Sequence, residues 1–77
     1  GRTLTISTTL PTAQVYTGNF LSGGCMGRQG RSYENREGVA LETQLLPNSI
    51  HIEKYPSVIL RKNQVFQAKT SYCFTVE

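Results

Sequence analysis

A chain of 77 residues forms at most one small domain, and a chain this short buries only about 60% of the surface that it exposes when unfolded. Apolar residues make up 38% of the sequence and charged residues 17%, with a net charge of +3, which excludes an intrinsically disordered tail. No apolar run approaches the roughly 18 residues of a membrane-spanning helix, so we expect no membrane partner.

Period-two alternation predicts strands from the N-terminus onward. Over residues 2–8, Leu4 and Ile6 lie on one face, with threonine and serine opposite. Pro11 then interrupts the pattern, and residues 13–17 predict a second short strand. The chain begins without methionine and shows no signal-peptide core, so we expect a processed product or a piece of a longer protein.

A glycine-rich loop is predicted over residues 18–36, with five glycines between Gly18 and Gly30. It does not match a phosphate-binding loop, because no Lys-Ser or Lys-Thr follows the glycines. Three of the chain's arginines gather here but are interrupted by Glu34 and Glu37. We interpret this loop as a flexible, solvated connection and expect no nucleic-acid partner, because such a partner needs a continuous basic stripe.

A third strand is predicted over residues 38–44, and it carries the first candidate for chemistry. Acidic side chains are depleted from strands, yet Glu42 lies in the middle of this one. A carboxylate on a sheet face contacts water, pairs with a cation or serves in a site. Gln14, in the preceding strand, is uninformative by itself.

The C-terminal half is predicted to contain an irregular loop over residues 47–56 and short strands over 57–61 and 66–76, with a turn at Lys62 and Asn63. His51 lies in the irregular loop without a nearby nucleophile motif, so we interpret it as a solvent-facing or packing residue. These elements together predict an all-β fold of antiparallel strands, a sheet or a sandwich.

Two cysteines, Cys25 and Cys73, form no CxxC pair, and His51 does not complete a zinc site with them. We therefore expect no metal and no other cofactor. A single disulfide is the alternative to free thiols, but nothing marks the chain as secreted. We expect two reduced thiols in a cytoplasmic protein.

Five blocks carry a family resemblance. Residues 14–21 read QVYTGNFL, residues 38–44 read GVALETQ, and residues 47–49 read PNS. Residues 55–60 read YPSVIL, and residues 70–74 read TSYCF. In this order and spacing, the blocks resemble motifs near the C-terminus of the aldose 1-epimerase, or galactose mutarotase, family. The resemblance implies that residues 1–77 are the C-terminal segment of one mutarotase-type β-sandwich domain.

The resemblance also implies an activity. Family members interconvert the α and β anomers of sugars such as galactose and glucose by acid–base opening of the sugar ring. The family's catalytic base, a glutamate, falls on Glu42, and a substrate-binding glutamine falls on Gln14. Strands hold such groups rigidly, and partial burial in a groove of the sheet would suit a glutamate that acts as a general base.

The departures from the family pattern limit what this chain does alone. The family's acid histidine, a second histidine and a sugar-binding aspartate lie upstream of the matching blocks, and this chain has no aspartate. His51 stands where the family usually carries asparagine, so we do not assign it the acid role. The family's P-G-x-Q turn reads PTAQ at residues 11–14, and its R-P-G-E turn reads RKNQ at residues 61–64.

We therefore expect an aldohexose substrate, a second partner in the upstream part of the parent protein, and an isolated chain that is inactive. One alternative is a non-catalytic carbohydrate-binding or regulatory β-module built from the same strands. A basic β-domain that binds nucleic acid is the remaining alternative, and its affinity would fall steeply with salt.

Overall fold

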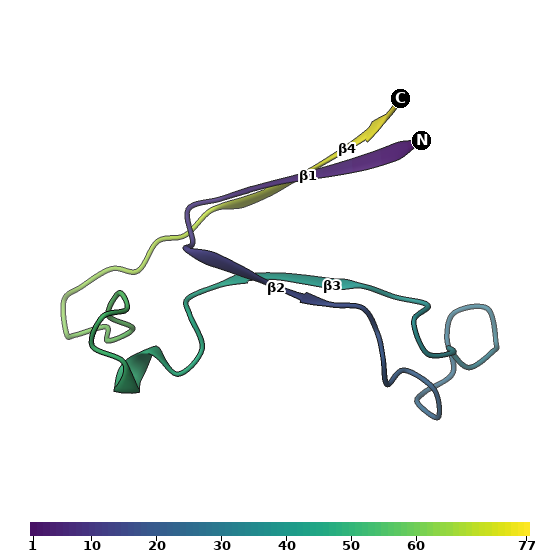
Figure 1. Cartoon of the computed structure of the whole chain (residues 1–77), viewed down its shortest axis with the longest axis horizontal. Coiled ribbons are helices and arrows are strands. Elements are labelled where there is room, and N and C mark those ends of the chain that lie inside the picture. The colour runs from purple at the N-terminus through teal and green to yellow at the C-terminus, as the bar shows by residue number, and fades with distance from the viewer.

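The protein folds into four antiparallel strands and one short 3₁₀ helix, in a computed structural model that describes residues 1–77 (Figure 1). The elements are β1 (Arg2–Thr8), β2 (Thr12–Tyr16), β3 (Ala40–Gln44), η1 (Ser49–His51) and β4 (Thr70–Val76). There is no α-helix, so the all-β prediction is confirmed. No helix has the length and apolar character that crossing a membrane requires.

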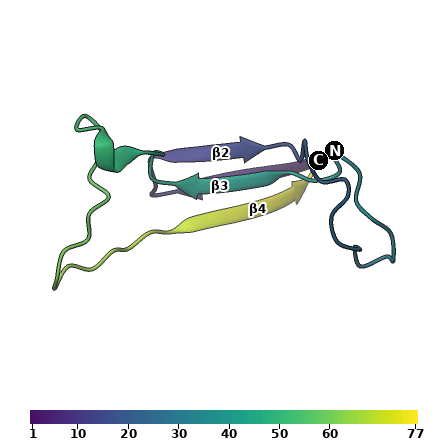
Figure 2. The same cartoon turned by 90° about the horizontal axis from the view of Figure 1, so that it is seen from below.

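The strands form two separate antiparallel ladders, β1 with β4 and β2 with β3. In the first ladder, Leu4 lies opposite Phe74 and Ile6 opposite Tyr72, so the apolar side chains of both strands share one face. This ladder joins the two ends of the chain, which lie side by side in Figures 1 and 2. The Glu77 N–H donates to the carbonyl of Gly1 over 2.9 Å.

The two ladders meet at a corner made by three threonines. The Thr70 hydroxyl on β4 lies 2.7 Å from that of Thr43 on β3 and 3.0 Å from that of Thr8 on β1. The Tyr72 hydroxyl donates to the Leu41 carbonyl over 3.2 Å. The face of β2 and β3 that carries Thr43 is therefore turned toward the first ladder.

Two predicted elements differ from the structure. Residues 57–61 form no strand, and β4 begins at Thr70 rather than at residue 66. An extended segment becomes a strand only when another strand pairs with its N–H and C=O groups, and no strand of this chain runs beside residues 57–69. The segment is therefore irregular, despite its suitable composition.

The loops contain more local structure than the sequence predicted. Within the predicted irregular loop, η1 begins after Asn48, which has φ of 60° and accepts a hydrogen bond from the His51 N–H over 3.0 Å. The predicted turn is confirmed, because Asn63 has φ of 68° and the Gln64 N–H donates to the Arg61 carbonyl. Cys25 and Cys73 are free and exposed, so no disulfide links them.

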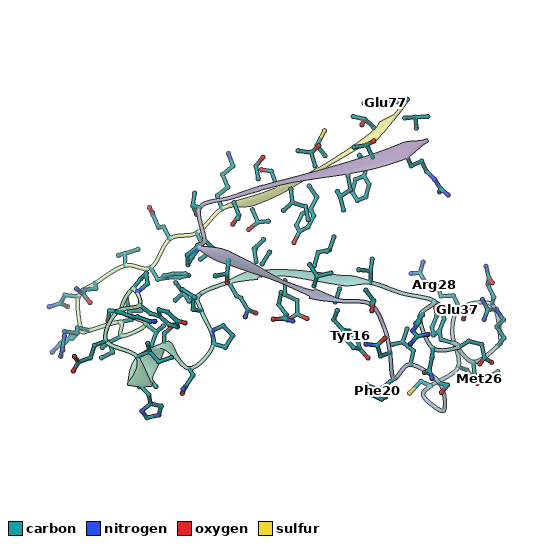
Figure 3. All side chains as sticks on the ribbon, in the orientation of Figure 1. Tyr16, Phe20, Met26, Arg28, Glu37 and Glu77 are labelled. Atoms are coloured by element: carbon teal, nitrogen blue, oxygen red, sulfur yellow. The ribbon has the colours of Figure 1, made fainter.

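The chain by itself forms no hydrophobic core. Its side chains are spread along both ladders (Figure 3). No apolar side chain is buried, and the accessible surface is 6838 Å², against about 4,700 Å² for a compact protein of this mass. The radius of gyration is 17.0 Å, where a compact chain of this length has about 11.5 Å. Only 22 hydrogen bonds join backbone groups, about two fifths of what a compact domain of this size has.

Candidate functional site

The two sequence-predicted site residues lie directly opposite each other. In the register of β2 and β3, Gln14 pairs with Glu42. Residues opposite each other in an antiparallel ladder have Cβ atoms about 4.5–5.5 Å apart and project from the same face. The ladder thus presents a carboxylate and an amide side by side, within the span of one sugar ring.

This pair projects from the outer face of the β2–β3 ladder. Thr43 contacts β4, and successive side chains along a strand alternate between faces, so Glu42 points away from the first ladder. Tyr16 shares the outer face, two residues after Gln14 and opposite Ala40. The outer face therefore carries Gln14, Tyr16 and Glu42 together.

Within this chain, the carboxylate and the amide are open to solvent. Gln14 and Glu42 are exposed, and neither side chain forms a hydrogen bond or an ion pair. No groove of the sheet buries Glu42 within these 77 residues. The physical reason is that no element of the 77 residues covers the outer face of β2 and β3. Both groups remain free to bind a ligand.

His51 does not join the pair. It lies exposed in η1, and its backbone, not its ring, makes the hydrogen bond to Asn48. No hydrogen bond connects its imidazole to Glu42 or Gln14. No group of three or more histidine, cysteine or acidic residues is arranged to hold a metal ion. This face therefore carries a carboxylate and an amide without a neighbouring histidine.

The glycine-rich loop begins directly at the site and is anchored there. The Tyr16 hydroxyl accepts a hydrogen bond from the Phe20 N–H over 3.0 Å, and the Arg36 N–H donates to the Gly18 carbonyl. Gly18 has φ of 72°, and a Cβ atom there would lie 2.7 Å from the Gly38 carbonyl oxygen. Glycine is therefore required where the two arms of the loop meet. The base of the loop thus has hydrogen bonds that its composition did not predict.

A single ion pair closes the far part of this loop. One Glu37 oxygen accepts hydrogen bonds from the Arg31 guanidinium and from the Glu34 N–H, each over 2.8 Å. The Arg31 hydrogen bond, followed by that of the Glu34 N–H, lowers the pKa of the Glu37 carboxyl below its usual value. The same hydrogen bond raises the pKa of Arg31. The basic cluster of the loop is thus partly neutralised from within.

We predict that this ion pair weakens only in acid. The pKa of the Glu37 carboxyl is lowered in the folded loop. The ion pair therefore stabilises the folded loop fully above the unfolded pKa of about 4.3, and this stabilisation is lost as the pH falls through the lower folded pKa. NMR of a Glu34→Gln chain, which lacks the nearest competing carboxyl, should show the amide of residue 34 titrating with a midpoint below 4.3. Adding Glu37→Gln should abolish that step, and a midpoint at the usual value would contradict the ion pair.

Comparison with known proteins identifies the family of this chain. The sequence profile described as aldose 1-epimerase matches residues 1–73, nearly the whole chain. The chain belongs to the aldose 1-epimerase family. The resemblance seen in the five sequence blocks is thereby confirmed.

Curated members of the aldose 1-epimerase family match along this chain at moderate identity. Galactose mutarotase of Homo sapiens is 40% identical over 76 residues, which cover 99% of this chain and 22% of the relative. Aldose 1-epimerase of Escherichia coli (strain K12) is 37% identical over 76 residues, which cover 96% of this chain and 22% of the relative. The chain thus spans about a fifth of the length of these relatives. No solved structure matches the chain significantly.

Sequence reasoning selected Gln14 and Glu42 as candidates in this aldose 1-epimerase family chain, but it did not predict that they pair or that Tyr16 lies beside them. One signal was available: strands 13–17 and 38–44 flank a single loop, which favours an antiparallel pair. The loop of about twenty residues does not fix the register, because only short turns do so. Tyr16 stood in the QVYTGNFL block, but its place on the outer face depends on that register.

Proposed function

We propose that this chain is the C-terminal segment of an aldose 1-epimerase that interconverts the α and β anomers of an aldohexose such as galactose or glucose. The observation that carries the proposal is the Gln14–Glu42 pair on one exposed sheet face, in a chain of this family. The chemistry needs a base for the anomeric hydroxyl, an acid for the ring oxygen and polar groups that orient the sugar.

Glu42 is proposed as the general base. Its carboxylate takes the proton from the hydroxyl on C1, the C1 oxygen becomes a carbonyl, and the C1–O5 bond breaks. The ring oxygen O5 takes a proton from the acid. After rotation about the C1–C2 bond, the same groups act in reverse and close the ring as the other anomer. An exposed carboxylate without an intramolecular partner, as Glu42 is here, is available to accept that proton.

Gln14 is proposed to orient the sugar. Its amide has both donor and acceptor atoms, so it is able to bind two neighbouring hydroxyl groups at once. Its place opposite Glu42 supports contact with hydroxyls near the anomeric carbon.

The acid is proposed to come from outside these residues. His51 is the only histidine, and it lies in η1 without any link to the Gln14–Glu42 pair. We propose that the upstream part of a longer cytoplasmic enzyme supplies an acid histidine opposite Glu42. The 22% share of the relatives that the chain spans supports this division.

Exchange NMR of galactose anomers at neutral pH tests the proposal. The informative protein is a chimera, the Homo sapiens galactose mutarotase in which this chain replaces the segment that it matches. We expect the chimera to accelerate anomer exchange and the isolated chain to leave the spontaneous rate unchanged. A folded chimera that binds galactose without accelerating exchange would contradict the proposal and favour the non-catalytic sugar-binding alternative.

A further inference from the structure

The far part of the glycine-rich loop forms a tight hairpin that the proposed mechanism does not use. We call residues 26–33 the arginine hairpin, and an antiparallel bridge joins its two arms. The Gly27 N–H donates to the Arg31 carbonyl over 2.8 Å, and the Gly30 N–H donates to the Gly27 carbonyl over 3.0 Å. These hydrogen bonds close a turn that has Arg28 at its tip and fix the backbone on both sides of it.

The arginine hairpin lines a pocket of about 300 Å³, a volume at the lower end of the range for small-molecule sites. Five residues line it, and none of them is acidic: Gly27, Arg28, Gln29, Arg31 and Tyr33. The four side chains end in two guanidinium groups, an amide and a phenol, all of which donate hydrogen bonds. A Cβ atom on Gly27 would lie 2.7 Å from the Tyr33 ring, so the glycine allows that ring to pack against the turn. A lining with many donors and no carboxylate favours an anionic ligand.

The two arginines of the pocket differ in their partners. The Arg31 guanidinium is held by Glu37 over 2.8 Å, yet its side chain is 53% exposed. Arg28 forms neither a side-chain hydrogen bond nor an ion pair, although Figure 3 shows it at the same end of the molecule as Glu37. Two guanidinium groups therefore line one pocket, and a carboxylate compensates only one of them. Because like charges repel, an anion bound to both would be stabilised there.

We propose that the arginine hairpin binds a phosphate group, either that of a small phosphomonoester or inorganic phosphate. The planar guanidinium of Arg28 is free to donate two parallel hydrogen bonds to phosphate oxygens. Arg31, oriented by Glu37, donates through its remaining N–H groups, and the Tyr33 hydroxyl is a further donor. This site uses side chains, unlike a glycine-rich phosphate-binding loop, in which backbone N–H groups and a lysine hold the phosphates. The inference does not depend on the role of Glu42.

NMR titration of the chimera with potassium phosphate tests the site, with phosphate replacing chloride so that the ionic strength stays constant. We expect the amide resonances of residues 27–33 to shift and to saturate at millimolar phosphate. Arg28→Gln should weaken binding by on the order of tenfold or more, because it removes charge-assisted hydrogen bonds. Arg28→Lys should be intermediate, because lysine keeps the charge but not the planar fork. Arg61→Gln removes the same charge from an exposed arginine outside the loop and should change the affinity less than about twofold.

Glucose 6-phosphate, as a second probe, distinguishes the two sources of the phosphate group. If Arg28→Gln weakens the binding of both probes, the site is supported: a preference for glucose 6-phosphate assigns it to a phosphorylated sugar, and equal affinities assign it to the free anion. Shifts that do not saturate, or equal losses from Arg28→Gln and Arg61→Gln, would overturn the site. Failure of the catalytic proposal looks different, because anomer exchange would be absent while phosphate binding persists.

Discussion

Replacing Glu42 by glutamine in the chimera is expected to slow catalysed anomer exchange by about 10²–10⁴-fold, the usual contribution of a general base. Glutamine keeps the shape of the side chain but accepts no proton at neutral pH. The free energy of unfolding should stay within about 0.5 kcal/mol of the unsubstituted chimera, because Glu42 is exposed and makes no hydrogen bond within this chain. Exchange NMR and urea unfolding of the same samples measure the two quantities.

Glu53→Gln provides the matched control for the loss of one exposed carboxylate. Glu53 is also exposed, but it follows η1 rather than lying on the outer face of β2 and β3. We expect that substitution to leave the exchange rate within a factor of about two, because a distant surface charge changes reactivity only weakly. Unchanged turnover after Glu42→Gln would remove Glu42 from the mechanism, whatever the control shows.

Replacing Gln14 by glutamate is expected to move the acidic limb of the pH profile of kcat/KM upward by roughly one unit. The new carboxylate would stand opposite Glu42, and two like charges about 5 Å apart repel by about 1–3 kcal/mol at effective dielectric constants between those of water and a protein surface. The two carboxyl groups then release their last proton at a higher pH, so the base becomes active only at that higher pH. Polarimetric rates across the pH range locate the limb.

Two other substitutions distinguish the effect of the added charge from the effect of losing the proposed contact between Gln14 and the sugar. Thr12→Glu puts the same charge on the same face but opposite Gln44, two pairs farther along the register, and should shift the limb less. Gln14→Ala removes the proposed sugar contact without adding charge, so it should raise KM and leave the limb in place. Equal shifts from Thr12→Glu and Gln14→Glu would contradict the register that places residues 14 and 42 together.

The sequence predicted local structure well wherever the residues of a segment decide its conformation by themselves. Alternation over residues 2–8 and 38–44 predicted strands because alternate side chains of a strand project to opposite faces. Asn63 predicted a turn because asparagine tolerates the left-handed conformation that it adopts. Motif resemblance selected Glu42 and Gln14, and the family to which the chain belongs is the one that the motifs indicated.

Pairing between distant segments was beyond what the sequence determined. The composition of residues 57–61 suits a strand, but the segment has no partner, since a strand depends on hydrogen bonds from a neighbour rather than on its own residues. The exposure of Glu42 has the same kind of cause, because burial requires another element to cover that face, and no element of this chain does so. The sequence alone thus indicated where the four strands that form lie, the turn at Asn63 and the candidate residues of this aldose 1-epimerase segment. Only the tertiary structure decided that Gln14 stands opposite Glu42 and that the two ladders diverge, because register and layer packing depend on contacts between residues far apart in the chain.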